Sequence, residues 1–340
     1  MTNVFTFDSN LTERQLLKRE FGLELCDLGD REKKNSIDFD SKTILLATCR
    51  IKTMGQILND CPDKSVVLFF FGNETYNLED YIFLNYFSNK IKFGLLYNVP
   101  KSSSLSQITG PVFGTAFDLR FEIFSEYKAF YRNVKNGFDL LSRTKKINLN
   151  FPYMEFPQGY SARFVYELEI AGLVDANSSV LNCSSHIKRE KDIVMSFVGQ
   201  QGSWYRQHVL KLAKKYFHDF DPILTQGWAG ERQGQKTTYL QSLRSSKFVL
   251  HPPGNLTNKT HRYLESLLMG ALPVLPPSTI QDPHLWEVWS ENLGRFSWIR
   301  IFEYLSNMDE IERVRIVENA LALEFVKYEK IRRILVEVIE

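Results

Sequence analysis

Short apolar runs alternate with amphipathic segments along most of the chain. Runs that are apolar on both faces predict buried strands at residues 43–48, 65–71, 91–97, 193–198, 221–225, 247–250 and 271–275. Apolar positions at helical spacing predict helices at residues 11–21, 78–87, 120–141, 204–217, 237–244, 258–269, 283–289 and 309–339. A further short strand is expected at residues 296–299. This alternation favours an α/β protein with doubly wound parallel sheets, which bind ligands at the carboxyl ends of their strands.

The alternation is interrupted once, which divides the chain. Residues 1–150 are expected to form the N-terminal domain and residues 193–310 the C-terminal domain. Residues 151–192 are expected to be a connector, because they begin with a proline-bounded aromatic stretch and continue with turn-rich sequence. Residues 311–340 are expected to form one or two C-terminal helices.

Composition narrows the class of protein. The chain has 340 residues, 44% hydrophobic and 24% charged, which is typical of a soluble globular protein. A net charge of +2 gives no overall field to recruit nucleic acid, so no nucleic-acid partner is expected. No apolar run reaches the roughly 18 residues of a membrane span, and the N-terminus has no signal-peptide pattern. We therefore expect a cytoplasmic protein, with a position at the inner face of the membrane left open.

The sequence lacks the common motifs of metal and dinucleotide sites. The four cysteines have no CxxC spacing, and no HExxH or EF-hand pattern occurs, so no metal site is predicted. The absence of GxGxxG argues against a nicotinamide or flavin dehydrogenase. The segment from Gly230 to Thr237 is similar to a phosphate loop, but three residues separate its glycines and Gln235 precedes Lys236. A kinase or ATPase is therefore not expected, and neither is a bound cofactor.

The stretch from Ser246 to Pro277 contains the strongest candidate site. It is expected to form a strand, a loop, a helix and a second strand, so the polar residues of the loop and first helical turn lie beyond the strand's carboxyl end. Arg262 and Glu265 are three residues apart and can share one helix edge. Arg262 could hold a diphosphate and Glu265 the hydroxyls of a ribose. An ordinary surface ion pair explains the same spacing.

Further binding residues are expected around this pair. Gly254, Asn258 and Lys259 belong to the loop before the helix, and His251 follows the first strand. Gly199 ends an earlier strand and allows a close backbone approach, while Arg206 lies in the first turn of the next helix and could reach a phosphate. A plain tight turn is the alternative for the Gly199 segment.

Two carboxylates in the first half are candidates for a general base. Glu74 follows the strand at residues 65–71, and Asp118 follows the Gly114-Thr115-Ala116 stretch. A carboxylate at a strand's carboxyl end can remove a proton from an attacking hydroxyl. Glu74 is preferred over Asp118, and His251 is the third titratable candidate. A turn or capping role is the alternative for each carboxylate.

The second half resembles the exostosin-like inverting glycosyltransferases. The resemblance covers residues 193–300 and is carried by Ser246 to Leu250, Pro253-Gly254, Arg262, Glu265 and the Gly270 to Leu275 strand. It implies the GT-B fold, in which two Rossmann-like domains face each other across a cleft and the C-terminal one holds a nucleotide sugar. It also implies inversion without a metal, with Arg262 on the donor diphosphate and Glu265 on the ribose. The segment from Lys259 to Glu265 is also loosely similar to inverting fucosyltransferases.

The hypothesis from the sequence is a metal-independent glycosyltransferase of polysaccharide biosynthesis. Its substrates would be a nucleotide-sugar donor and a glycan or lipid-linked glycan acceptor, with the N-terminal domain presenting the acceptor. A non-catalytic carbohydrate- or nucleotide-binding protein with the same fold is the alternative. A fucosyltransferase-like enzyme is a further alternative. The donor base and sugar, the acceptor and the linkage stay open.

Overall fold

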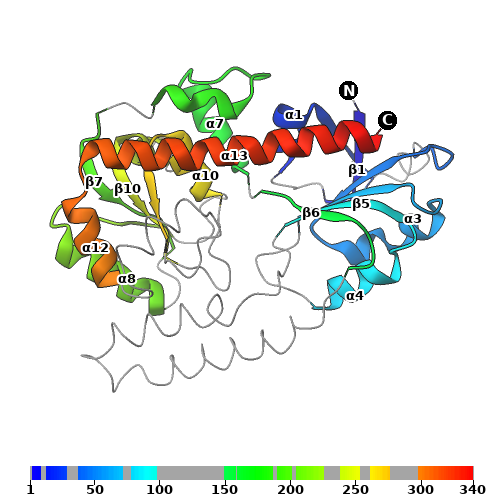
Figure 1. Ribbon diagram of the computed structural model, residues 1–340, viewed down its shortest axis with the longest axis horizontal. Helices are drawn as coiled ribbons and strands as arrows, with labels where there is room; N and C mark the ends of the chain where they lie inside the picture. The colour runs from blue at the N-terminus through cyan, green and yellow to red at the C-terminus, as the bar shows by residue number, and fades with distance from the viewer. Residues whose placement is uncertain are drawn as a thin grey trace.

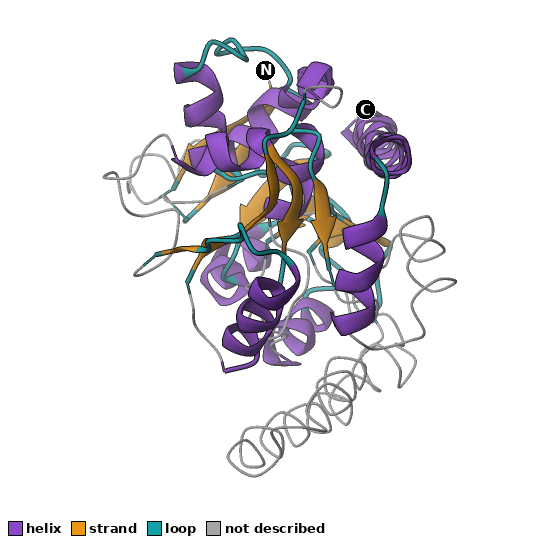
Figure 2. Ribbon diagram, turned by 90° about the vertical axis from the view of Figure 1, so that its left-hand side faces the viewer, coloured by secondary structure: helices purple, strands orange, loops and turns teal. Residues whose placement is uncertain are grey.

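The computed structural model describes residues 2–8, 13–28, 37–71, 78–97, 149–157, 159–186, 190–200, 204–225, 238–252, 261–275 and 298–339. These residues form an α/β protein in which parallel strands are covered by helices (Figures 1 and 2).

The first half is built on a six-stranded Rossmann-like sheet in which every pair of neighbouring strands is parallel. Its strands are β1 (Thr2–Thr6), β2 (Leu23–Asp27), β3 (Ile44–Thr48), β4 (Val66–Phe70), β5 (Ile91–Leu96) and β6 (Tyr153–Glu155). Every residue of β3 and β4 is buried, as expected for strands covered on both faces. Helices flank the sheet: α1 (Arg14–Phe21), η1 (Ile51–Met54), α3 (Gly55–Asp60) and α4 (Leu78–Tyr86).

The order of these strands is β2-β1-β3-β4-β5-β6. From β1 the chain moves outward to β2, and it then returns to place β3 on the other side of β1. The direction of winding therefore reverses between β1 and β3. In open α/β sheets such a reversal leaves a crevice at the carboxyl ends of the two strands.

The second half contains two smaller parallel sheets. The strands β7 (Ile193–Ser196), β10 (Ser246–Leu250) and β11 (Leu272–Val274) form one, in the order β11-β10-β7. The strands β8 (Val198–Gly199) and β9 (Ile223–Leu224) form the other. The helices of this half are α7 (Ala162–Ile170), η3 (Val180–His186), α8 (Trp204–Tyr216), α9 (Thr238–Ser245), α10 (Arg262–Leu268) and α12 (Trp298–Asn307).

The last helix, α13 (Glu310–Ile339), runs along both halves, as Figure 1 shows in red and orange. Near its start, the guanidinium of Arg313 donates a hydrogen bond to the carbonyl of Gly270, just before β11. Near its end, the carbonyl of Val338 accepts a hydrogen bond of 2.6 Å from the ammonium of Lys92 on β5. A 30-residue helix is about 45 Å long, enough to reach from the three-stranded sheet to the six-stranded sheet.

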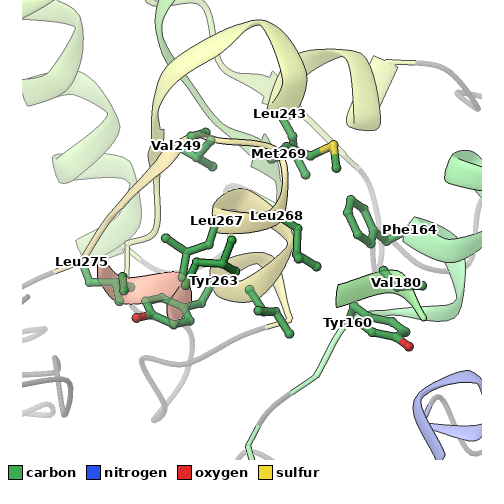
Figure 3. Close-up of a cluster of buried hydrophobic side chains, with 14 of the residues drawn as sticks. Tyr160, Phe164, Val180, Leu243, Val249, Tyr263, Leu267, Leu268, Met269 and Leu275 are labelled. Atoms are coloured by element: carbon green, nitrogen blue, oxygen red, sulfur yellow. The ribbon is translucent and has the colours of Figure 1, made fainter. Parts of the chain in front are cut away.

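A continuous apolar core extends from the first sheet to α10 and α13. Helix α10 is buried along its length, and Figure 3 shows its Leu267 and Leu268 lying among side chains from β10, α7 and η3. Close packing of this kind fixes the position of the first residue of α10, Arg262.

Most of the predicted elements are confirmed in the described residues, including parallel sheets in both halves. The strand expected at residues 296–299 is wrong in its described part, because Trp298 begins α12 and packs with Ile301, Phe302 and Leu305 at helical spacing. The helix expected from residue 258 is described from Arg262 onward. The helices expected at residues 120–141 and 283–289 lie outside the described residues.

Candidate functional site

Arg262 lies at the start of α10, where β8 ends. Its Nη1 donates a hydrogen bond of 2.8 Å to the carbonyl of Val198, and its guanidinium carbon lies 5.6 Å from the centre of the Phe197 ring. A carbonyl and an aromatic face both stabilise a cation. A guanidinium has five N–H donors, and the described residues supply an acceptor for one. Arg262 is therefore a fixed, half-buried cation with donors left for a ligand.

Gly199 lies directly beneath this guanidinium. A Cβ atom at residue 199 would lie 2.9 Å from Nη1 of Arg262 and 3.2 Å from the Phe197 ring. Both contacts are closer than side chains normally tolerate, so Arg262 can occupy its observed position only because residue 199 is glycine. Sequence analysis predicted a close approach to a ligand at this residue, and in the structure the approaching group is the arginine.

Arg206 brings a second guanidinium to the same ring. From the first turn of α8, its Nη1 donates to the carbonyl of Gln200 at 2.8 Å, and its guanidinium carbon lies 6.0 Å from the centre of Phe197. Arg206 and Arg262, which come from different helices, are thus gathered around one aromatic side chain. Two neighbouring cations favour an anionic ligand, and a diphosphate offers enough acceptors for both.

His251 is buried behind Arg262, just after β10. Its Nε2 lies 3.1 Å from the hydroxyl of Ser266, and that hydroxyl donates its proton to the carbonyl of Arg262 at 2.6 Å. The hydroxyl must therefore accept from Nε2–H, which assigns the tautomer. Burial, and secondarily the charge of Arg262, hold the pKa of His251 well below its usual value. A neutral, buried imidazole supports the start of α10 and is a poor general base for a solvent-borne substrate.

Glu265 is buried as well, with 1% of its surface exposed. Its Oε1 accepts two hydrogen bonds from Ser161, from the backbone N–H and from the hydroxyl, each at 2.7 Å. Its Oε2 accepts a hydrogen bond from the hydroxyl of Tyr239 on α9. Both carboxylate oxygens are occupied by protein donors, so the expected ribose contact would require Ser161 or Tyr239 to move. In this structure Glu265 fastens α10 to α7 and α9.

A short segment links the carboxyl edge of the six-stranded sheet to the start of α10. The segment begins at the carboxyl end of β6, where the backbone N–H of Phe156 donates to the carbonyl of Leu96 at 2.8 Å. Further along the segment, the Gly159 carbonyl lies 3.3 Å from Nδ1 of His261, directly before Arg262. The next residues, Tyr160 and Ser161, continue to α7. Arg262 is thereby held near the edge of the six-stranded sheet at which its strands end.

The structure brings together Gly199, Arg206, His251 and Arg262, and it buries Glu265 beside them. The remaining predicted site residues, which are Glu74, Asp118, Gly254, Asn258 and Lys259, lie outside the described residues. Sequence analysis did not single out Phe197, although it contacts both arginines, because an aromatic residue in a strand is usually core.

Comparison with family models, with curated proteins and with solved structures gives no match to this chain. The site is therefore interpreted from its own geometry. Within the described residues, none of the helices combines the length and apolar character needed to cross a membrane. The same residues contain no group of three or more His, Cys, Asp and Glu side chains that could hold a metal ion.

Proposed function

We propose that the protein is an inverting glycosyltransferase of GT-B form that transfers a sugar from a nucleotide-sugar donor to a glycan or glycoconjugate hydroxyl. The observation that carries the proposal is the setting of Arg262. Its guanidinium is fixed by the Val198 carbonyl and the Phe197 ring at the carboxyl end of β8, and within the described residues only one of its N–H donors has an acceptor. Such a group is suited to a diphosphate.

The chemistry follows from charge. When the bond between the anomeric carbon and the diphosphate breaks, negative charge develops on the leaving diphosphate. Arg262 and Arg206 are already oriented by carbonyl contacts, so they stabilise that charge without reorganising. Removing one such donor typically lowers turnover about 10²- to 10³-fold.

The GT-B arrangement is supported by two observations. Parallel sheets form both halves of the described chain, and residues 159–161 connect the carboxyl edge of the first to the start of α10. Helix α13 contacts both halves, which holds them in a fixed arrangement relative to each other. In this proposal the second half binds the donor and the first half presents the acceptor. Glu265 acts as a structural anchor of the donor half and not as a ribose ligand.

The proposal is tested with a panel of UDP-, GDP- and dTDP-sugars. We expect at least one of them to raise the melting temperature of the wild-type protein and to be cleaved to the nucleoside diphosphate. Arg262→Ala should abolish the shift, and Arg262→Lys should restore only part of it because an ammonium cannot make a bidentate contact. Stabilisation without cleavage, even with simple sugars as acceptors, would instead identify a non-catalytic binding protein. No stabilisation by any member would contradict both functions.

A further inference from the structure

The carboxyl ends of β1 and β3 carry an acid that sequence analysis did not single out. Asp8 follows β1, and its Oδ2 accepts hydrogen bonds from the hydroxyl of Thr48 at 2.8 Å and from the backbone N–H of Cys49 at 2.7 Å. Thr48 is the last residue of β3. The carboxylate thus bridges the two strands between which the winding of the sheet reverses, where open α/β proteins bind their ligands.

Asp8 is held in one orientation by a closed set of hydrogen bonds. Its backbone N–H donates to the hydroxyl of Thr6 at 3.0 Å. The Thr48 hydroxyl, which donates to Oδ2 of Asp8, in turn accepts a hydrogen bond from the backbone N–H of Arg50 at 2.8 Å. Thr6 and Thr48 are fully buried, whereas Asp8 is half-buried. Because the buried Thr48 hydroxyl has both its donor and its acceptor role filled, it leaves the carboxylate little freedom.

The two oxygens of Asp8 differ. Oδ2 accepts both hydrogen bonds, while the described residues supply no donor to Oδ1. A carboxylate with one oxygen anchored and the other left to accept has the geometry that a general base requires. Glu13 is the other acid nearby, but it is buried and so less accessible to a substrate.

Asp8 and Arg262 both lie near the edge of the six-stranded sheet at which its strands end. Asp8 comes two residues after β1. At the same edge, the segment that follows β6 reaches α10: the Gly159 carbonyl lies 3.3 Å from Nδ1 of His261, and Arg262 is the next residue. The acid of the first half and the cation of the second half are therefore both placed at the carboxyl ends of these strands.

We propose that the acceptor binds at the carboxyl ends of β1 and β3 and that Asp8 is the catalytic base, an inference that rests on the proposed function. The acceptor hydroxyl oxygen forms a bond to the anomeric carbon of the donor sugar. The bond from that carbon to the diphosphate oxygen breaks, and its electron pair leaves with the diphosphate. The hydroxyl proton passes to Oδ1 of Asp8, which is later deprotonated by solvent.

The decisive experiment compares two acceptors, using the nucleotide sugar that stabilises the wild-type protein most. With water or a sugar hydroxyl as acceptor, Asp8→Asn should lower the release of nucleoside diphosphate about 10²- to 10⁴-fold, the usual contribution of a general base. With sodium azide as acceptor, Asp8→Asn should form glycosyl azide at the wild-type rate, because azide has no proton to remove. Binding of the nucleoside diphosphate, measured by calorimetry, should be unchanged.

Matched variants separate catalysis from folding. Asp63→Asn removes an exposed carboxylate and should leave both rates unchanged. Thr48→Val keeps the buried shape but removes the hydroxyl that orients Asp8, so the hydroxyl-acceptor rate should fall while the azide rate is kept. Melting temperatures of all three variants show whether each is folded.

Several results would overturn the inference and leave the proposed function standing. One is a hydroxyl-acceptor rate for Asp8→Asn within about threefold of wild type, well short of what loss of a base costs. Another is an equal loss of rate in Asp8→Asn with hydroxyl and azide acceptors, which would indicate that Asp8 has a structural role. A third is a reduced hydroxyl-acceptor rate with an unchanged azide rate in Glu74→Gln or Asp118→Asn and not in Asp8→Asn. If the wild-type protein cleaves no nucleotide sugar, the proposed function fails first, and this inference fails with it.

Discussion

The carboxylate of Glu265 accepts hydrogen bonds from both the backbone N–H and the hydroxyl of Ser161, although the two residues are 104 positions apart in the chain. Ser161 is also the N-cap of α7, because its hydroxyl accepts from the backbone N–H of Phe164 at 3.2 Å. One buried acid therefore fixes where α7 begins and where α10 lies. The placement of Arg262, three residues before Glu265, depends on this contact.

Replacement of Glu265 should lower stability. In Glu265→Ala the donors of Ser161 and Tyr239 lose their acceptor inside the protein, and an unsatisfied buried group costs about 1–3 kcal/mol. We expect the free energy of unfolding in urea to fall by about 3 kcal/mol or more. Glu265→Gln should cost less because the amide keeps one acceptor oxygen. Glu318→Ala, at an exposed site on α13, is the control and should change stability by less than about 0.5 kcal/mol.

Gly199→Ala should weaken the binding of a nucleoside diphosphate. The new methyl group would lie 2.9 Å from Nη1 of Arg262, so the guanidinium must move away from its position beside Val198 and Phe197. Loss of one charge-assisted contact of about 1.5 kcal/mol corresponds to roughly tenfold weaker binding by calorimetry. Gly22→Ala is the control: Gly22 has φ +65° at the C-cap of α1, so alanine should cost about 1 kcal/mol of stability without changing affinity. Wild-type affinity in Gly199→Ala would argue against Arg262 as a ligand.

Arg332 should contribute to the attachment of α13. Its Nε donates to the carbonyl of Glu20 at 2.8 Å, and its Nη2 contacts the Glu20 carboxylate at 3.2 Å. Glu20 is buried and also accepts a hydrogen bond from Tyr160 at 2.7 Å. Arg332→Ala leaves that carboxylate without its cation, and we expect a loss of about 2 kcal/mol in urea unfolding. Arg333→Ala, one residue further along at an exposed position, should be nearly neutral; equal effects would contradict this role.

His251 should make stability depend on pH below about 6.5. Its pKa is held well below the usual value in the folded protein, by burial first and by the charge of Arg262 second. The unfolded chain therefore binds the proton more readily, so the stability that His251 contributes is complete above about pH 6.5 and is lost as pH falls. The slope approaches about 1.4 kcal/mol per pH unit. Unfolding of His251→Gln between pH 5 and 7 should show a shallower dependence than the wild type; equal slopes would contradict the assignment.

The sheets could be predicted where the sequence pattern is decisive. Strand β4 is apolar on both faces and is correctly predicted, whereas β1 and β2 were not predicted. Strand β2 lies at the edge of its sheet with exposed Glu24 among its residues, so it has no continuous apolar run. An edge strand needs burial on one face only, and a short alternating segment is difficult to distinguish from a loop.

The candidate site was predictable only in part. The turn at Gly199 and the position of Arg206 indicated that both lie near Arg262, and the structure brings the three together. The spacing of Arg262 and Glu265 showed that they share a helix edge. It did not show that Arg262 is half-buried while Glu265, one helical turn further, is fully buried. That difference comes from Ser161 and Tyr239, which are distant in sequence. No local pattern contains such tertiary contacts.

Calorimetric titration of UDP, GDP and dTDP into the wild-type protein and Arg262→Ala tests the central claim most directly. We expect at least one nucleoside diphosphate to bind the wild type, and Arg262→Ala to bind it at least tenfold more weakly, the equivalent of about 1.4 kcal/mol. Arg300→Ala, which removes an exposed arginine of α12, should bind as the wild type does. Equal affinity of Arg262→Ala and wild type, or no binding of any nucleoside diphosphate to the wild type, would contradict the account.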